Sequence, residues 1–200
     1  MTAGGILFAL GALSATAAPS DLSFWIDPCP AVESGCRASD RELAEWSLRA
    51  WERASEGRLR IVKAASREKA LLRFRWVTQR EGLYGEARPI LVDGKPGAEL
   101  YIRPEMDGLG EDIAAAAAKD PLLRDAIVYL TCLHESGHGL GLRHTAKFDD
   151  IMYSFGHGGD IGEYFGRYRR KLQSRADIAK ESGVSAADRE ALARAVAGLR

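Results

Sequence analysis

The feature that most constrains this chain is a cluster of three of its four histidines, at positions 134, 138 and 144. Asp120 as an N-cap and Pro121 at the first helical position predict a long helix that runs to about Gly139. On a helix, a spacing of four places His134 and His138 on one face, one turn apart, so both imidazoles can bind one metal ion. The spacing therefore predicts a metal site built on this helix.

The third histidine follows a glycine that can end the helix. Gly141 can adopt a positive φ, which lets the chain leave the helix and turn back toward it, bringing His144 to the same ion. Three histidine ligands and one open position are typical of a catalytic zinc site, because structural sites are closed by four protein ligands. Glu135 lies next to the first ligand, where a carboxylate can take a proton from a zinc-bound water as general base.

The run from His134 to His144 resembles the metzincin signature H-E-x-x-H-x-x-G-x-x-H, and residues 151–153 resemble the Met-turn that follows it. The short spacing to Met152, and the small hydroxyl residue directly after the third histidine, are similar to the matrixin (matrix metalloprotease-like) family. The likeness is strong only at residues 134–153. It implies that His134, His138 and His144 bind zinc, that Glu135 is catalytic, and that Met152 forms an apolar floor under the imidazoles.

The leading interpretation of this resemblance is a zinc-dependent endopeptidase, a hydrolase whose partner is a protein or peptide substrate. Matrixins carry a second, structural zinc site with histidines ahead of the catalytic helix. No histidine precedes His134 here, so we expect one Zn²⁺ per chain. Two alternatives stay open: a non-catalytic zinc-binding interaction domain, which would have no use for Glu135, and a zinc hydrolase of cell-wall peptides.

The order of the expected elements predicts a single metzincin-like α+β domain over residues 19–200. Its about five-stranded mixed sheet is backed by helices, with the zinc site on the catalytic helix and a further helix at the C-terminus. Strands are expected near residues 22–26, 59–62, 70–77, 82–90 and 98–102, and helices near 40–55, 113–119, 121–139 and from 185 onward. Pro96-Gly97 marks the expected turn between the last two strands. Gly82 to Ala87 is the candidate edge strand for pairing with an extended substrate.

The segment from Ser154 to Val184 is longer than in a minimal matrixin domain, and we expect it to be irregular. Its glycines permit hinge motion, and Tyr164, Phe165 and Tyr168 supply apolar area, so it is a candidate cover for the cleft. The alternative is a surface insertion without a role. His157 lies in this segment and is expected to be an exposed loop histidine.

Residues 1–18 read as a probable signal peptide, with an apolar centre and the small residues Ala15-Thr16-Ala17 as a cleavage site. This segment predicts a secreted or periplasmic protein, with no stable membrane span if the segment is removed. No Lys or Arg precedes the apolar run, which leaves two alternatives: a true start further upstream, or an uncleaved anchor.

The cysteines agree with export. Cys29 and Cys36 are close enough in sequence to form a small disulfide loop, with two free thiols as the alternative, whereas Cys132 is expected to be a buried small hydrophobe. The formal net charge of zero and the pI of about 6.9 give no electrostatic indication of a nucleic-acid partner.

Overall fold

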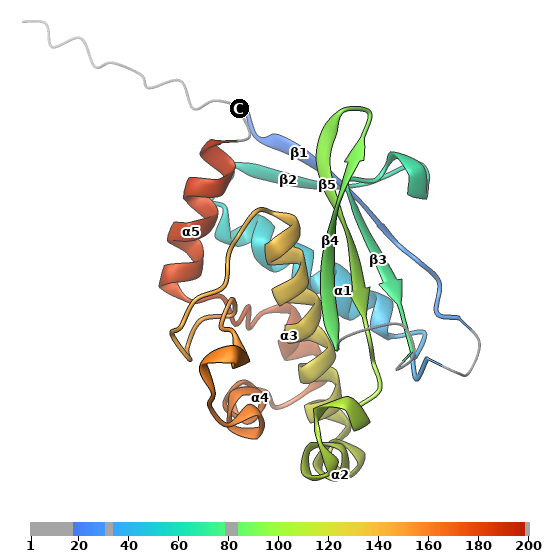
Figure 1. The fold of residues 1–200 in the computed structure, drawn as a ribbon, viewed down its shortest axis with the longest axis vertical. Coiled ribbons are helices and arrows are strands. Elements are labelled where there is room, and N and C mark those ends of the chain that lie inside the picture. Colours follow the sequence, from blue (N-terminus) through green and yellow to red (C-terminus); the bar gives the residue numbers. More distant parts are fainter. Residues whose placement is uncertain (1–17, 31–33, 79–83, 199–200) are drawn as a thin grey trace, which may run out of the picture.

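A five-stranded mixed sheet forms one layer of the fold, with its strands in the order β2-β1-β3-β5-β4 (Figure 1). The computed structural model describes residues 18–30, 34–78 and 84–198. The strands are β1 (Ser20–Ile26), β2 (Leu59–Lys63), β3 (Leu72–Trp76), β4 (Gly85–Val92) and β5 (Lys95–Ile102). The predicted α+β single domain is therefore confirmed.

The sheet is parallel except at one edge. β1 pairs in parallel with β2 and β3, and β3 pairs in parallel with β5, whereas β4 runs antiparallel to β5 and forms the edge. Parallel neighbours need a crossover, and α1 (Asp40–Ala54) supplies it between β1 and β2. Along β3, Leu72 and Phe74 are buried while Arg73 and Arg75 are partly exposed. The sheet thus buries one face only.

Five α-helices occur in the described part of the chain, together with short 3₁₀ segments. After α1 they are α2 (Glu111–Lys119), α3 (Pro121–Gly139), α4 (Ile161–Arg169) and α5 (Ala186–Ala197). The 3₁₀ segments are η1 (Arg67–Lys69), η3 (Asp107–Leu109), η4 (Phe155–His157) and η5 (Arg175–Ala179). The start of α3 is capped as predicted, because the Asp120 side chain accepts hydrogen bonds from the N–H groups of Leu122 and Leu123 at 3.0 and 3.2 Å.

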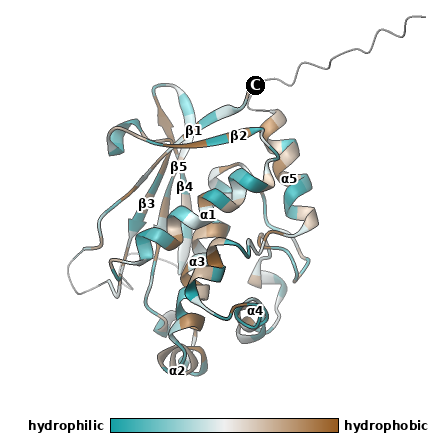
Figure 2. Cartoon of the chain, turned by 180° about the vertical axis from the view of Figure 1, so that it is seen from behind, coloured by the Kyte–Doolittle hydropathy of each residue, from teal (hydrophilic) through white to brown (hydrophobic). Residues whose placement is uncertain are grey.

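α1 and α3 pack against each other over the buried face of the sheet (Figure 1). In the view from behind, α1 shows mainly hydrophilic colours (Figure 2), while its buried residues include Leu43, Leu48 and Trp51, as expected of an amphipathic helix. Trp51 of α1 is fully buried, and its indole N–H lies 3.0 Å from the carbonyl oxygen of Leu133 and 3.1 Å from the Ser136 hydroxyl. This contact fixes the part of α3 that carries the histidines.

The β4–β5 turn lies at Asp93-Gly94, so the prediction of a turn at Pro96-Gly97 is wrong. Asp93 and Gly94 both have positive φ, 51° and 77°, which a two-residue type I′ turn requires and proline cannot adopt. Pro96 lies inside β5, beyond the stretch that pairs with β3, which begins at Ala98. β4 begins at Gly85, and residues 82 and 83 of the predicted edge strand lie outside the described residues.

Residues 154–184 are not irregular as predicted, since they contain η4, α4 and η5. The Asp160 side chain caps α4 by accepting a hydrogen bond from the N–H of Glu163 at 2.9 Å. Tyr164, Phe165 and Tyr168 then fall at helical spacing on its buried side. Because the segment begins with several glycines, the short amphipathic helix that follows them was not predicted from the sequence.

The cysteine predictions are confirmed: Cys29 and Cys36 form a disulfide, and Cys132 is fully buried in α3. Residues 1–17, which hold nearly all of the predicted signal peptide, lie outside the described residues. No helix in the described ranges is both long and apolar enough to cross a membrane.

Candidate metal centre

The three histidines of the motif converge on one point. His134 and His138 project from α3, and His144 comes from the chain that follows Gly141, whose φ of 88° is the predicted positive value. The Nε2 atom of His144 lies 3.2 Å from Nε2 of His134 and 3.0 Å from Nε2 of His138. The potential ligand atoms of all three lie within 4.8 Å of one another.

Backbone carbonyls orient the two helical imidazoles. Nδ1 of His134 lies 2.7 Å from the carbonyl oxygen of Ile151, and Nδ1 of His138 lies 2.9 Å from that of Leu142. A carbonyl can only accept, so Nδ1 carries the proton and the lone pair of a neutral ring is on Nε2, facing the other histidines. Burial lowers the pKa of His134 to about 4, so this ring is neutral at pH 7.

These residues fit a zinc ion. Zn–N bonds of about 2.0–2.1 Å at tetrahedral angles place ligand nitrogens about 3.3–3.4 Å apart. The two Nε2 separations of 3.0 and 3.2 Å are close to that value. Three neutral imidazoles are a preferred donor set for catalytic zinc, and burial also lowers the pKa of His144. His134, His138 and His144 could therefore hold Zn²⁺ and leave a fourth position for a small molecule.

Met152 packs beneath this group. Its side chain is 1% exposed and approaches α3 at Gly137, between the two helical histidines. A Cβ added to Gly137 would lie 2.5 Å from the Met152 sulfur and 3.0 Å from the ring of Trp51. The glycine of the motif therefore makes room for the methionine, as the predicted apolar floor requires.

We expect the free energy of unfolding to respond strongly to the size of the side chain at position 152. Met152→Ala would leave a cavity in a fully packed site and should cost roughly 2–5 kcal/mol, whereas Met152→Leu conserves volume and should cost less than about 1.5 kcal/mol. Urea denaturation of the two variants measures the difference. Equal and negligible losses would contradict the burial of Met152.

A polar network fixes the loop that carries His144. Thr145 and Tyr153 form an isolated β-bridge, and the Thr145 hydroxyl donates to the Asp150 carboxylate at 2.9 Å. The buried Asp188 at the start of α5 accepts from the N–H groups of Ile151 and Met152 at 2.8 and 3.4 Å. Ser185 and Asp188 also form a capping box at the start of α5, and the reach of Asp188 to the Met152 backbone was not predicted.

Glu135 lies beside the three histidines with its carboxylate in a confined space. Its side chain is buried, and burial, with a smaller contribution from Glu86, raises its pKa to about 8. A divalent cation bound by the imidazoles would lower the pKa of Glu135 and so favour its ionised carboxylate. β4 passes so close that a Cβ added to Gly85 would lie 2.5 Å from Oε1 of Glu135.

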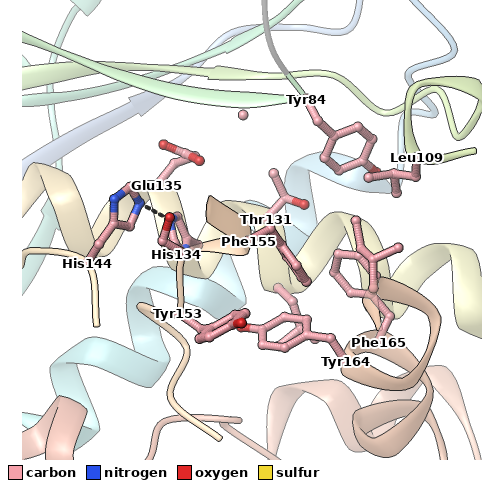
Figure 3. Close-up of a pocket in the computed structure, with 14 residues that line it drawn as sticks. Tyr84, Leu109, Thr131, His134, Glu135, His144, Tyr153, Phe155, Tyr164 and Phe165 are labelled. Atoms are coloured by element: carbon pink, nitrogen blue, oxygen red, sulfur yellow. Dashed lines mark hydrogen bonds between the residues drawn. The ribbon is translucent and has the colours of Figure 1, made fainter. Parts of the chain in front are cut away.

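A cavity of about 230 Å³ extends from His134 and Glu135 between β4, α3 and α4. Its walls are mostly apolar or aromatic: Tyr84, Leu109, Leu130, Tyr153, Phe155, Ile161, Tyr164 and Phe165. Figure 3 shows Tyr84 and Leu109 on one side and Tyr153, Tyr164 and Phe165 on the other. Residues 154–184 thus contribute a wall to this cavity. The choice between a cover for the cleft and a surface insertion without a role stays a prediction.

Sequence reasoning named Tyr164 and Phe165 but missed the walls formed by Leu109, Leu130 and Ile161. These three are ordinary apolar residues on separate elements, and no local pattern distinguishes them from core residues. His157 is exposed, as predicted. Tyr168, grouped with Tyr164 in the sequence, faces α3 instead, where its ring stacks on Tyr129 with centroids 5.6 Å apart.

No protein-family model and no curated protein matches the chain. Among solved structures, the chain is similar to the crystal structure of archaemetzincin from Methanopyrus kandleri, with 16% sequence identity and a TM-score of 0.42. The alignment covers 92% of this chain and 99% of that one. Because this similarity is low, the function of the site is inferred from its geometry alone.

Proposed function

We propose that the chain is a zinc-dependent endopeptidase in which His134, His138 and His144 bind one Zn²⁺ and Glu135 is the general base. One observation carries the proposal. Three imidazole nitrogens converge beside a buried carboxylate, at the mouth of an apolar cavity and beneath β4. A site that only binds metal would not need that carboxylate next to its ligands.

Zinc, when bound, polarises a carbonyl and lowers the pKa of water to near 7. Groups of the chain itself would transfer the proton and orient the imidazoles. The Glu135 carboxylate would take the proton of the attacking water at Oε and deliver it to the nitrogen of the leaving amine. The carbonyls of Ile151 and Leu142 would keep the lone pairs of His134 and His138 on Nε2 throughout.

The surroundings of the site favour an extended peptide as substrate. β4 is an edge strand whose far side pairs with no strand of the described sheet, so a peptide backbone can add to it main chain to main chain. Apart from Glu135, no Asp, Glu, Lys or Arg of the described residues lines the adjacent cavity. We propose that it takes an apolar side chain from one of the residues that flank the scissile bond.

We further propose that the protein acts outside the cytoplasm. The Cys29–Cys36 disulfide supports an oxidising compartment, and the sequence of residues 1–18 supports export. The activity proposed above does not depend on this location.

Cleavage of a mixed peptide library, with and without a zinc chelator, tests the proposed function. We expect cleavage to stop when the metal is removed, to return when Zn²⁺ is restored, and to select large apolar residues at one fixed position beside the cut. A chain that binds zinc but leaves both casein and the library intact would instead support a zinc-binding interaction domain. Hydrolysis confined to cell-wall peptides would identify the other alternative.

A further inference from the structure

Tyr164 of α4 connects the apolar cavity to the metal centre. Its ring lines the cavity, and the side chain is only 5% exposed. Its hydroxyl lies 3.1 Å from the carbonyl oxygen of Ile151 and 3.2 Å from that of Asp150. Since a carbonyl can only accept, the hydroxyl is the donor to this pair of backbone groups.

The Ile151 carbonyl is also the acceptor for a metal-site histidine. Nδ1 of His134 lies 2.7 Å from the same oxygen that Tyr164 contacts. A carbonyl oxygen has two lone pairs, so both hydrogen bonds can form together. The direction of the His134 ring thus depends on a carbonyl whose second partner is the Tyr164 hydroxyl.

The Tyr164 ring has little freedom to move. Phe148, Phe155 and Phe165 contact it edge to face, with centroids 5.1 to 5.7 Å away. The Arg167 guanidinium lies 4.7 Å from the ring centroid. Burial also raises the pKa of the hydroxyl, which keeps it a donor at neutral pH. The ring therefore presents a fixed hydrogen-bond donor to the loop around Met152.

We propose that Tyr164 is a positioning residue for the metal site, which acts through the Ile151 carbonyl on the orientation of His134. This role rests on the proposed function only in requiring that the three histidines bind a metal ion. Partners of a ligand's second nitrogen typically affect metal affinity or activity by about 10–100-fold. Tyr164 is one hydrogen bond further away, so its contribution should lie at or below the lower end of that range.

The test is Tyr164→Phe, which keeps the aromatic ring and removes only the hydroxyl. We expect its affinity for Zn²⁺, measured by competition with a chromophoric chelator, to fall several-fold, to about tenfold at most. The visible spectrum of the Co²⁺-loaded protein should shift as the ligand geometry changes. For a peptide with an apolar residue at the selected position, kcat should fall while KM changes less than about twofold, because the cavity wall is intact.

Two matched variants separate this role from a merely structural one. Tyr168→Phe removes a hydroxyl from the same helix, one that donates to the Glu181 carbonyl at 2.5 Å, away from the metal site. It should keep wild-type affinity for Zn²⁺ and the wild-type Co²⁺ spectrum. Leu109→Ala opens the cavity from the wall opposite Tyr164, so it should raise peptide KM and leave Zn²⁺ affinity unchanged.

If wild type and Tyr164→Phe bind Zn²⁺ equally and give the same Co²⁺ spectrum, the positioning role is overturned while the proposed function stands. An equal loss of affinity in Tyr168→Phe would also overturn it, since the effect would then come from α4 as a whole. If wild type binds Zn²⁺ but cleaves no peptide, the peptidase proposal fails while the metal-affinity comparison still decides the role of Tyr164. A wild-type chain that binds no metal ion overturns both.

Discussion

Glu135→Gln is expected to lower kcat for peptide hydrolysis by roughly 10²–10⁴-fold while zinc content and fold are retained. Glutamine has nearly the same shape as glutamate but cannot accept a proton from water at neutral pH. Glu135 lies on α3 directly after His134 and lines the cavity. No other carboxylate of the described residues lines the same space, so none is placed to replace it. Steady-state kinetics together with metal analysis of the purified variant measure the effect.

The matched control for this experiment is Glu163→Gln, on α4. Glu163 is exposed and pairs with Arg170 at 2.5 Å, away from the three histidines. An exposed pair of this kind contributes little to stability, so this variant should keep wild-type kinetics. Wild-type turnover in Glu135→Gln would show that Glu135 is not the base and would exclude the mechanism proposed above.

The convergence of the three histidines could be predicted from the sequence because their geometry is mostly local. A helix fixes the spacing of His134 and His138, and the positive φ of Gly141 is a property of a single residue. The prediction of the β4–β5 turn was wrong because the position of that turn is not decided locally. Both Pro96-Gly97 and Asp93-Gly94 are turn-forming pairs, and the strand register that decides between them depends on β3, which is distant in sequence.

The supporting contacts could not be predicted because they join segments that are far apart in the chain. Asp188 reaches the backbone at Ile151 and Met152 from α5, and Trp51 reaches Leu133 from α1. Neither contact has a sequence pattern beyond an ordinary cap or an ordinary buried aromatic residue. Such contacts nevertheless bear on the orientation of His134, since Leu133 directly precedes it and the Ile151 carbonyl accepts a hydrogen bond from its Nδ1.

His144→Ala tests the metal site most directly, because His144 is the one proposed ligand that does not lie on α3. We expect zinc affinity to fall by more than the roughly 10–100-fold that changes to outer-shell partners cause, and peptide cleavage to fall with it. The fold should persist, since His144 is exposed while Thr145 next to it keeps its bridge to Tyr153.

The fourth histidine of the chain supplies the control for that variant. His157 is exposed in η4, is not among the three converging ligands, and should be replaceable by alanine without loss of zinc. Chelator competition on the two alanine variants and wild type, with thermal unfolding as a check on folding, compares them under the same conditions. Full zinc occupancy and activity in His144→Ala would refute the three-ligand site. If His157→Ala loses zinc while His144→Ala keeps it, the metal is bound by His157 and not by His144. The comparison is a fair one, because both histidines are exposed and both lie on the chain between α3 and α4.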